Sequence, residues 1–450
     1  MSQPTIAIVG RPNVGKSTLF NRLCGGRKAI VADRPGTTRD RHFGTSEWNG
    51  RHFWVVDTGG LVPGSDEPMD RLIAQQVEFA LAEADVVVFV VDGREGIHPL
   101  DEMVADRLRG LPKPLLLVVN KLDALEKATG QHDFWQLGLG EPIPMSAQAG
   151  RGSGDMLDIL VSRLPEAGED PHPDAIPVAI IGRPNAGKSS LINRLIGEER
   201  HVVSPVPGTT RDAIDSYLRY QGKVLKFIDT AGLRRRAKVT DDVEFYSTVR
   251  TERAIGLAQV CVLVVDAALG VHNQDLRIAN EAWDQGCGLI VFVNKWDLIP
   301  EKDANTASKG QEQVMEQAPF LRYVPFLYAS AQTGQRVRKV LDLVLQVAEA
   351  RERRVPTAEV NEVLQALLAR QAPPQKPGEE VKLLYASQVG TAPPTIAIVS
   401  NRPDDVPESY ERYLQNGFRK AWDFAGAPLR LRFTARGART ALKHAGDGRR

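Results

Sequence analysis

The sequence has little of what marks a secreted, membrane-spanning or strongly charged protein. Only three of its 450 residues are cysteines, Cys24, Cys261 and Cys287, and they show no metal-binding or disulfide-framework spacing. Lysine and arginine number 57 against 56 acidic residues, and this net charge of +1 excludes a polycation that coats nucleic acid. Apolar runs such as 86–91 and 115–119 fall far short of the ~20 residues that span a bilayer, and the N-terminus has no signal-peptide pattern. We therefore expect free thiols, a cytoplasmic location and no membrane partner.

Length and composition indicate an ordinary globular chain with several domains. Hydrophobic residues make up 42% of the sequence and charged residues 25%, a balance that excludes wholesale disorder. At ~150 residues per domain, a chain of 450 residues is expected to form about three domains.

Five short motifs occur twice, in the same order and at closely matched spacing. The first three pairs are separated by 172 residues, the fourth by 174 and the last by 184. The pairs are GRPNVGKST (10–18) and GRPNAGKSS (182–190), PGTTRD (35–40 and 207–212), DTGGL (57–61) and DTAGL (229–233), NKLD (120–123) and NKWD (294–297), and the dipeptide SA (146–147 and 330–331). Chance does not produce five ordered matches, so the sequence predicts a duplicated domain. The extra residues of the second copy fit the polar stretch after Pro300, which we expect to be a surface insertion.

Short apolar runs alternate with helical patterns in both copies. Near-continuous Val/Ile/Leu runs are typical of parallel strands that are covered on both faces. We expect such strands at 5–9, 53–57, 86–91 and 115–120, and at 177–181, 225–229, 260–266 and 289–294. The predicted fold class is α/β, with two doubly wound P-loop domains in tandem whose ligand loops follow the carboxyl ends of the strands.

Composition sets the predicted domain boundaries. The segment PEAGEDPHPDAIP (165–177) has four prolines, four acids and no apolar periodicity, so it is predicted to be an extended linker. The predicted organisation is a first copy at 1–164, a linker at 165–176, a second copy at 177–352 and a C-terminal domain at 353–450. For that last domain we expect a helix at 357–370, strands at 380–387 and 395–400, a helix at 407–424 and a strand at 428–434, a small α+β fold.

The motif GxxxxGK[ST] between a strand and a helix predicts a phosphate-binding loop in each copy. Backbone N–H groups of the glycines wrap phosphates at a helix N-terminus, where the helix dipole favours anions. We expect Lys16 and Lys188 to reach the β- and γ-phosphates, and Ser17 and Ser189 to ligate Mg²⁺. Two occurrences in the same context argue against a chance glycine-rich turn.

Each copy also has an aspartate that ends a strand before a glycine-rich turn. Asp57 and Asp229 are placed to hold Mg²⁺ through water, and Gly60 and Gly232 to donate a backbone N–H to the γ-phosphate. A lone DTxG is also compatible with a capping aspartate. Two occurrences, each 47 residues beyond the start of a phosphate loop, favour the nucleotide site.

The NKxD motifs predict the base. A carboxylate accepts from N1–H and the 2-amino group of guanine together, whereas adenine lacks both donors. We assign that carboxylate to Asp123 and Asp297. The other base contacts are assigned to Asn120 and Asn294 at N7, to the stems of Lys121 and Lys295 along the base, and to backbone N–H groups of 146–147 and 330–331 at O6. The predicted ligand of both copies is GTP, with GDP as its product, and not ATP.

These motifs resemble the EngA (Der) GTPases, bacterial tandem-domain proteins that assist assembly of the large ribosomal subunit. The resemblance covers essentially the whole chain: two GxPNxGKS domains, PGxTRD ahead of each DTxG strand, and a C-terminal module similar to a KH domain. The duplication separates this family from related GTPases that carry one such domain. The resemblance implies hydrolysis of GTP to GDP and phosphate, and a precursor of the large ribosomal subunit with its rRNA as partner. We expect a monomer.

The resemblance also assigns the switch residues. Thr38 and Thr210 would close over Mg²⁺ and the γ-phosphate, with the threonine just before each as the alternative. Ras-like enzymes position water with a glutamine after DTxG, but the two copies have Leu61 and Leu233 there. A leucine does not orient water, so slow intrinsic hydrolysis is expected.

Two further features of the motifs bear on charge neutralisation. Asn13 and Asn185 match the asparagine that helps to hold K⁺ beside the phosphates in potassium-stimulated relatives. A cation there would neutralise the phosphate charge that an arginine finger otherwise neutralises. We favour this K⁺-binding role over the alternative, an asparagine that stabilises the loop turn. Arg39 and Arg211 are interpreted as surface residues of the switch loop rather than as fingers.

Two basic segments are candidate rRNA contacts. Residues 234–238 (RRRAK) directly follow the second DTAGL, so phosphate binding there would depend on the nucleotide state; a solvated basic loop is an equal alternative. The C-terminal domain lacks the GxxG loop with which KH domains clamp a nucleic-acid backbone. We therefore favour a packing role for it between the GTPase domains, with RNA contact left to its basic tail, Arg436, Arg439, Lys443, Arg449 and Arg450.

The candidate site residues form three groups. Catalytic roles are assigned to Lys16, Thr38, Lys188 and Thr210, Mg²⁺ binding to Ser17, Thr38, Asp57, Ser189, Thr210 and Asp229, and K⁺ binding to Asn13 and Asn185. The GTP contacts are Gly10, Arg11, Pro12, Asn13, Val14, Gly15, Lys16, Ser17, Asp57, Thr58, Gly59, Gly60, Leu61, Asn120, Lys121, Leu122, Asp123, Ser146 and Ala147 in the first copy. In the second copy they are Gly182, Arg183, Pro184, Asn185, Ala186, Gly187, Lys188, Ser189, Asp229, Thr230, Ala231, Gly232, Leu233, Asn294, Lys295, Trp296, Asp297, Ser330 and Ala331.

The predicted function is a GTP-hydrolysing switch that binds and assists assembly of the large ribosomal subunit. The alternative is a GTP-sensing regulatory protein in which one copy is a slow sensor. A membrane-remodelling GTPase is disfavoured, because the sequence shows no amphipathic or apolar anchor.

Overall fold

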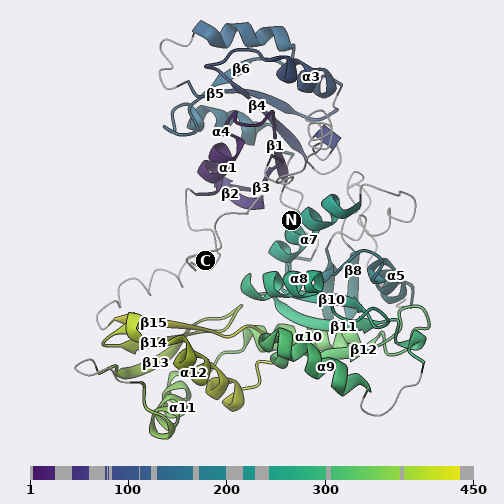
Figure 1. Ribbon diagram of the computed structural model, residues 1–450, viewed down its shortest axis with the longest axis vertical. Coiled ribbons are helices and arrows are strands. Elements are labelled where there is room, and N and C mark those ends of the chain that lie inside the picture. Colours follow the sequence, from purple (N-terminus) through teal and green to yellow (C-terminus); the bar gives the residue numbers. More distant parts are fainter. Residues whose placement is uncertain are drawn as a thin grey trace. The chain divides into compact units, whose positions relative to one another are not determined.

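The computed structural model describes residues 4–25, 43–59, 77–78, 80, 84–110, 112–122, 129–165, 172–198, 216–228, 243–300, 306–374 and 380–435. The chain divides into two compact units, Met1–Pro171 and His172–Arg450. The first unit holds the first copy of the repeat, and the second holds the second copy together with the C-terminal domain (Figure 1). Within the described ranges, no helix is long and apolar enough to cross a membrane.

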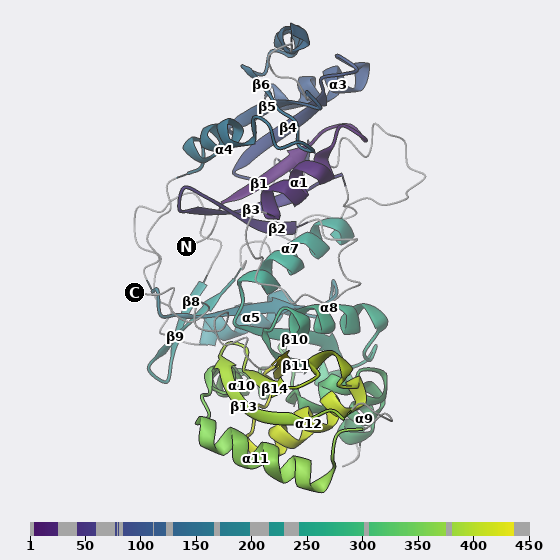
Figure 2. The ribbon, with the colours of Figure 1, turned by 90° about the vertical axis from the view of Figure 1, so that its left-hand side faces the viewer.

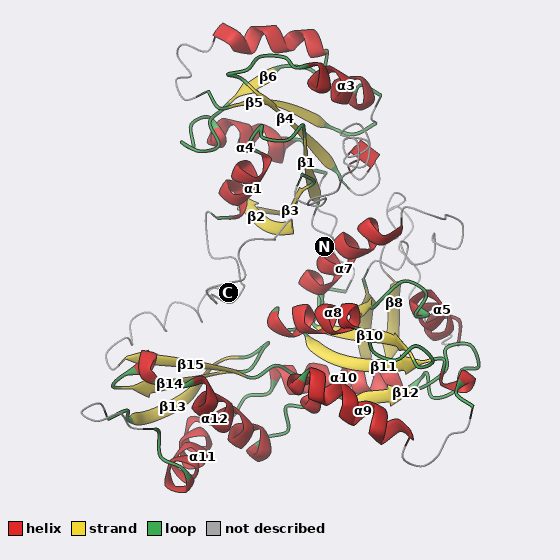
Figure 3. Ribbon diagram, in the orientation of Figure 1, coloured by secondary structure: helices red, strands yellow, loops and turns green. Residues whose placement is uncertain are grey.

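The first copy is a six-stranded sheet with helices on both faces (Figure 3). Its strands are β1 (Thr5–Val9), β2 (Phe43–Trp48), β3 (Arg51–Asp57), β4 (Val86–Asp92), β5 (Leu115–Asn120) and β6 (Pro142–Pro144). Its helices are α1 (Lys16–Cys24), α3 (Pro99–Leu108) and α4 (Ser153–Ser162), with a 3-10 segment η2 (Thr129–Leu137). The strand order is β2-β3-β1-β4-β5-β6, and the strands pair in parallel except β2, which runs antiparallel to β3.

Burial explains the apolar runs of the central strands. Every residue of β1 and of β4 is buried, because helices cover both faces of the sheet. On one face Ile6 and Ile8 of β1 pack in a single core with Leu19 of α1 and Leu160 of α4. The four strands expected for this copy from such runs are present, and β2 and β6 extend the sheet at its two edges.

The second copy repeats this topology, with strand order β12-β11-β10-β7-β9-β8. Its strands are β7 (Ile176–Ile181), β8 (Ser216–Tyr220), β9 (Lys223–Phe227), β10 (Val260–Asp266), β11 (Gly288–Asn294) and β12 (Phe326–Tyr328). Its helices are α5 (Lys188–Glu198), α7 (Val243–Leu257), α8 (Asn273–Asp284), α9 (Thr306–Gln317) and α10 (Lys339–Glu352), with 3-10 segments η4 (Trp296–Leu298) and η5 (Pro319–Tyr323). Helix α9 lies in the polar stretch that was expected to be a surface insertion.

The C-terminal domain is a three-stranded sheet with two helices against it. Its elements are α11 (Thr357–Arg370), β13 (Leu383–Gly390), β14 (Thr395–Ser400), η6 (Pro403–Asp405), α12 (Glu408–Ala421) and β15 (Arg430–Ala435). Strand β14 is central, antiparallel to β13 and parallel to β15. Leu364 of α11 and Phe418 of α12 pack with Ile396 and Ile398 of β14, which gives the small domain its own core. The α-β-β-α-β order predicted from the sequence is confirmed.

This domain is docked on the second copy, in the same compact unit (Figure 2). The loop between α12 and β15 bonds through Gly426, whose N–H donates to Tyr323 O and whose carbonyl accepts from Leu289 N, both at 2.7 Å. Arg351 of α10 donates to Gly286 O at 2.9 Å and to Ala392 O at 3.2 Å. The expected packing of the C-terminal domain is therefore present with respect to the second copy.

The topology places the ligand loops of each copy at one edge of its sheet. In the first copy β1 lies between β3 and β4, so successive connections leave it to opposite sides. Such a switch point opens a crevice at the carboxyl ends of the strands. The segments that follow β1, β3, β5 and β6 there are the phosphate loop, the DTG turn, NKL and the SA loop.

Candidate functional site

Two glycines permit the tight turn of the phosphate loop. Gly10 has a φ of +149° and Gly15 a φ of +97°, and the equivalent glycines of the second copy, Gly182 and Gly187, have +131° and +99°. A Cβ at Gly15 would collide with the amide of Asn120. Gly15 is also the N-cap of α1, where it offers no side-chain acceptor, and the first turn of α1 has no acidic residue. This helix N-terminus therefore has the form of an anion site.

The lysine of each phosphate loop lies back across that loop. Lys16 Nζ donates to the carbonyls of Gly10 at 2.7 Å and Arg11 at 2.8 Å. Lys188 Nζ donates to the two equivalent carbonyls, at 2.6 Å each. Burial, only partly opposed by the nearby Asp57 carboxylate, lowers the pKa of Lys16 to about 8, and the charge of Arg11 adds to the decrease. A phosphate that approached this buried ammonium would strongly stabilise its charged form.

Ser17 and Asp57 bring two oxygen ligands together in the first copy. The Ser17 hydroxyl donates to Asp57 Oδ2 at 2.5 Å, and the Gly59 N–H donates to Oδ1 of the same carboxylate at 3.0 Å. Thr58 fixes the turn by donating its hydroxyl to Ile8 O at 2.6 Å. A hydroxyl and a carboxylate beside an anion site are the donors that Mg²⁺ prefers, so these residues fit that ion. In the second copy Ser189 is the second residue of α5, as Ser17 is of α1.

The NKxD asparagines join the phosphate loop to the SA loop. Asn120 Nδ2 donates to Val14 O at 2.8 Å, and its Oδ1 accepts from Ala147 N at 2.8 Å. Asn294 makes the same two bonds at 2.9 Å each, to Ala186 O and from Ala331 N. These side chains therefore hold two ligand loops at a fixed distance, and their contact with N7 of guanine stays a prediction.

The NKxD lysines are each held by an aspartate that ends the neighbouring strand. Lys121 Nζ lies 2.5 Å from Asp92 Oδ2, and Lys295 Nζ lies 2.5 Å from Asp266 Oδ2. Burial alone would raise the pKa of both carboxyls, but the bond from the lysine and bonds from backbone amides lower it below the ordinary value. Both aspartates are therefore charged and clamp the lysine stems that were predicted to lie along the base.

The aspartate that was predicted to select the base in the second copy has an unsatisfied oxygen. Asp297 Oδ1 is buried and has no hydrogen-bond partner within the part of the chain that is described. An unsatisfied buried acceptor is costly, and the N1–H and 2-amino donors of guanine would satisfy it. Trp296 and Tyr328, with ring centroids 4.7 Å apart, brace this segment.

The SA loops are held from the helix that follows each phosphate loop. Arg22 of α1 donates through Nε to Ala147 O and through Nη2 to Gln148 O, the latter at 2.8 Å. Arg194 of α5 donates to Ala331 O at 3.2 Å and also to Gln332 O. The backbone predicted to contact O6 of guanine is therefore fixed to the same helix that carries the phosphate-binding N-terminus.

Asn13 and Asn185 have left-handed backbones, with φ of 67° and 63°. Asparagine adopts this conformation more readily than most residues, so the loop geometry accounts for the residue type in both copies. A role in holding K⁺ stays a prediction.

The structure brings most predicted site residues together and does not describe the rest. Residues 10–17, 57–59, 120–122 and 146–147 gather in the first copy, and 182–189, 294–297 and 330–331 in the second. The predicted residues that lie outside the described ranges are Thr38, Gly60, Leu61, Asp123, Thr210, Asp229, Thr230, Ala231, Gly232 and Leu233, together with Arg39, Arg211, 234–238 and the tail after 435.

Sequence reasoning missed three residues in each copy that hold the site in place. The equivalent positions in the two copies are Arg22 and Arg194, Asp92 and Asp266, and Asp101 and Asp275, the last two in the first turns of α3 and α8. Each has a signal in the duplication, because NRL, VVD and the segments HPLD (98–101) and HNQD (272–275) recur at the offset of the nearest motif.

Known proteins match the chain over nearly its whole length. The family described as 50S ribosome-binding GTPase matches residues 5–121 and 177–295, and the family described as KH-domain-like of EngA bacterial GTPase enzymes, C-terminal, matches residues 354–434. Proteins named GTPase Der are similar to it. The one from Gemmatimonas aurantiaca is 55% identical over 431 residues, 96% of this chain and 98% of that protein. Those from Moorella thermoacetica and Caldicellulosiruptor saccharolyticus are each 48% identical, over 96% and 95% of this chain and 99% and 97% of the relatives.

These matches confirm the predicted resemblance and the prediction that the chain is a GTPase. They cover both GTP-binding copies and the C-terminal domain in the order found here. The chain belongs to the GTPase Der (EngA) family.

Proposed function

We propose that this GTPase is a nucleotide-controlled switch that binds a precursor of the large ribosomal subunit and assists its assembly. The observation that carries the proposal is the match of both GTP-binding copies to a family described as 50S ribosome-binding GTPase. Two nucleotide sites in one chain allow four nucleotide combinations, so different states can favour different arrangements of the domains.

The chemistry proposed for each copy is attack of water on the γ-phosphate, in line with the leaving GDP. Lys16 and Lys188 would neutralise charge on the β- and γ-phosphates, and the helix N-termini would bind them through backbone N–H groups. The copies have Leu61 and Leu233 where a glutamine would orient water, so catalysis would come from positioning and charge neutralisation. Thr38 and Thr210 are the proposed switch residues.

Mg²⁺ and K⁺ are the proposed cofactors. Mg²⁺ would neutralise charge on the β- and γ-phosphates, held by Ser17 and Asp57 in the first copy and by Ser189 and Asp229 in the second. The 2.5 Å contact between Ser17 Oγ and Asp57 Oδ2 supports this donor pair. For K⁺, Asn13 and Asn185 are the proposed ligands, on the basis of the resemblance.

The C-terminal domain would relay the state of the second copy. Its backbone bonds to Tyr323 and Leu289 support this role, because they join it to η5 and to the start of β11. The opposite end of β11 leads into the NKWD segment of the nucleotide site. Contact with rRNA is assigned to residues 234–238 and to the basic tail beyond 435.

Sedimentation tests the ribosomal partner. Cell extract that contains the protein would be run through a gradient with GDP, GTP or a non-hydrolysable GTP analogue. We expect co-migration with large subunits in the analogue, weakened by salt, because phosphate contacts release counterions. The Lys16→Ala, Lys188→Ala double variant is the matched control and should stay at the top. If the unaltered protein stays at the top with every nucleotide, the ribosomal role is wrong.

A further inference from the structure

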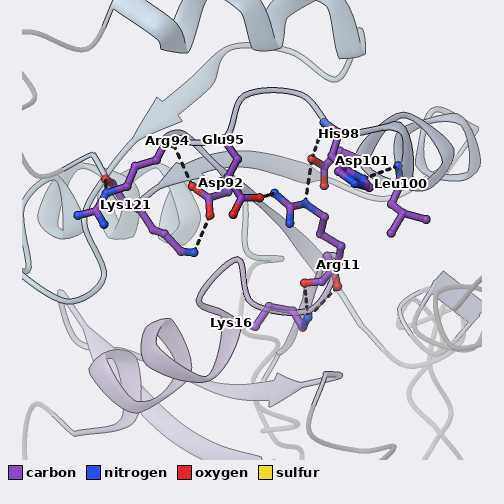
Figure 4. Close-up of polar contacts among 10 residues, drawn as sticks. Arg11, Lys16, Asp92, Arg94, Glu95, His98, Leu100, Asp101 and Lys121 are labelled. Carbon is purple, nitrogen blue, oxygen red and sulfur yellow. Dashed lines mark hydrogen bonds and ion pairs between the residues drawn. The ribbon is translucent and has the colours of Figure 1, made fainter. Parts of the chain in front are cut away.

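Each phosphate loop is tied to a distant helix by its second residue. Arg11 Nε lies 3.3 Å from Asp101 Oδ2, and Arg183 Nε lies 2.8 Å from Asp275 Oδ2, the latter an ion pair without a straight hydrogen bond. Both aspartates are completely buried. The pairing joins the loop after β1 to the start of α3, and the loop after β7 to the start of α8, although the partners are about 90 residues apart in sequence (Figure 4).

The same aspartates also begin those helices. Asp101 Oδ2 accepts from the N–H of His98 at 3.1 Å, and Asp275 Oδ2 from the N–H of His272 at 3.0 Å, each within a capping box. Oδ1 of each aspartate is buried and has no hydrogen-bond partner among the described residues. A buried carboxylate of this kind depends on an opposite charge, which the arginine supplies.

The arginines are in turn bonded to the catalytic lysines through their main chain. The carbonyl of Arg11 accepts from Lys16 Nζ at 2.8 Å, and that of Arg183 accepts from Lys188 Nζ at 2.6 Å. A side chain anchored to a buried group fixes the position of its own backbone. The orientation of each lysine is therefore linked to a helix that lies outside the nucleotide motifs.

We propose that Arg11 and Arg183 are positioning residues of GTP hydrolysis, which hold the phosphate loops against α3 and α8 and act through Lys16 and Lys188. Their side chains point to the aspartates and not toward the loop lysine, as the first copy shows in Figure 4. They are therefore distinct from an arginine finger, which must reach the transferred phosphate.

The two arginines, which anchor the phosphate loops, differ in how many carboxylates they contact. Arg11 Nη2 also lies 2.7 Å from Glu95 Oε2, so the first loop has a second carboxylate. The equivalent position of the second copy is Leu269, and Arg183 Nη2 reaches the carbonyl of Gly270 at 3.3 Å instead. The second phosphate loop therefore depends more heavily on its aspartate.

Steady-state kinetics of the full chain test the positioning role. Lys188→Ala reports on the first copy alone, and in that background Arg11→Met should lower kcat for GTP by ~10- to 100-fold with KM changed less than about threefold. Arg11→Lys, which keeps a charge beside Asp101, should restore most of the lost rate. The matched control is Arg109→Met, since Arg109 is bonded to the exposed Asp106 and to Leu137 O in the same copy and not to the phosphate loop.

The outcomes separate positioning from general stability. A loss of kcat with an unchanged thermal transition and with rescue by lysine supports the proposal. An unchanged kcat, or a rise in KM that accounts for the whole loss, overturns it. Asp101→Asn, which keeps an acceptor for the capping box but removes the charge, is the second variant if Arg11→Met does not fold.

The inequality of the anchors gives an independent test. Asp275→Asn, measured in a Lys16→Ala background, should lower kcat at least threefold more than Asp101→Asn measured in a Lys188→Ala background. Adding Glu95→Leu to Asp101→Asn should bring its loss to that of Asp275→Asn, and adding Leu269→Glu to Asp275→Asn should reduce the loss. Equal losses for Asp101→Asn and Asp275→Asn, unaffected by residue 95, contradict the role of Glu95.

Discussion

The ammonium of Lys121 lies 2.5 Å from Oδ2 of Asp92, the last residue of β4. Because the bond from Lys121 helps to lower the pKa of Asp92 against the effect of its burial, the carboxylate is charged throughout the neutral range. Asp92→Asn would leave the lysine stem without its clamp. We expect GDP affinity in the first copy to fall ~10-fold, about 1.4 kcal/mol, and equally at pH 6 and pH 8.

Calorimetric titration with GDP in the Lys188→Ala background would measure this loss. Asp106→Asn is the control, because Asp106 is exposed and pairs with Arg109 on the surface of the same copy. A loss that appears only at the lower pH, or that is as large for Asp106→Asn, would contradict the clamp.

The buried Oδ1 of Asp297 predicts how strongly the second copy selects guanine. Inosine triphosphate keeps N1–H but lacks the 2-amino group, so it should bind ~10-fold more weakly than GTP. Asp297→Asn should lower GTP affinity by ~100-fold or more, because an amide offers one acceptor where two donors point. Competition binding in the Lys16→Ala background would measure both effects.

Two results would contradict the assignment of Asp297 to the guanine base: equal affinity for GTP and inosine triphosphate, or normal GTP binding by Asp297→Asn. Asp405→Asn is the matched control, since Asp405 pairs with Arg402 at 2.6 Å in the C-terminal domain and lies apart from the base-binding motif.

Elements buried on both sides could be predicted from the sequence, and partly exposed edges could not. Strand β14 begins and ends where its apolar run places it. Helix α11 also matches its expected bounds, because Val360, Leu364 and Leu367 recur at a helical period although its other face is exposed. Strands β2 and β8 were missed, because FGTSEW and SYLRY lie at sheet edges and lack a continuous apolar run. Strand β13 begins three residues later than expected, and its pairing with β14 is irregular at both ends.

For the site, residues within a contiguous motif could be predicted and their distant partners could not. Lys16 and Asp297 belong to contiguous motifs, so local spacing predicts their roles. Asp101 supports Arg11 only because the fold brings the start of α3 beside the phosphate loop, a relation that spans 90 residues and follows no local pattern. The burial of Asp101 also could not be predicted, because the sequence does not distinguish a fully buried aspartate from an exposed one.

A pH dependence of stability is predicted from Glu252 of α7. Burial and the like charge of Glu281 raise the pKa of Glu252 to about 7, while Arg277 opposes the shift. Because this pKa lies above its ordinary value of 4.5, protonation favours the folded state. The folded protein therefore loses stability as pH rises from about 4.5 to 7, and the loss is complete above 7.

Glu252→Gln removes the cost of burying a charged carboxylate at this position above pH 7. At pH 8 the variant should gain about 2–3 kcal/mol, or a thermal transition of the second unit higher by ~5 °C, and at pH 5 it should show little gain. Scanning calorimetry at the two pH values measures the difference. Glu281→Gln is the companion variant, because removing the like charge should move the pH window downward. A gain that is the same at both pH values would show that Glu252 is not the titrating group.

Arg419 of α12 is predicted to hold the C-terminal domain on the second copy. Its guanidinium lies 4.3 Å from the ring centroid of Tyr323 and 5.5 Å from that of Trp283, and burial lowers its pKa to about 10. It also donates to the carbonyls of Phe424 and Ala427, at 3.1 and 2.7 Å. Arg419→Ala would remove two hydrogen bonds and a stacked cation, about 2–4 kcal/mol.

The backbone bonds of Gly426 report directly on this docking. Its N–H donates to Tyr323 O, so its hydrogen exchange requires the domains to separate locally. In Arg419→Ala the Gly426 and Leu289 amides should exchange at least ~30-fold faster, while the Val262 amide in the middle of β10 should not change. Arg412→Ala, which removes only an exposed pair with Glu408 on the same helix, should leave all three amides unaffected. Unchanged exchange at Gly426 in Arg419→Ala would mean that backbone bonds and apolar contacts hold the domains together without the arginine.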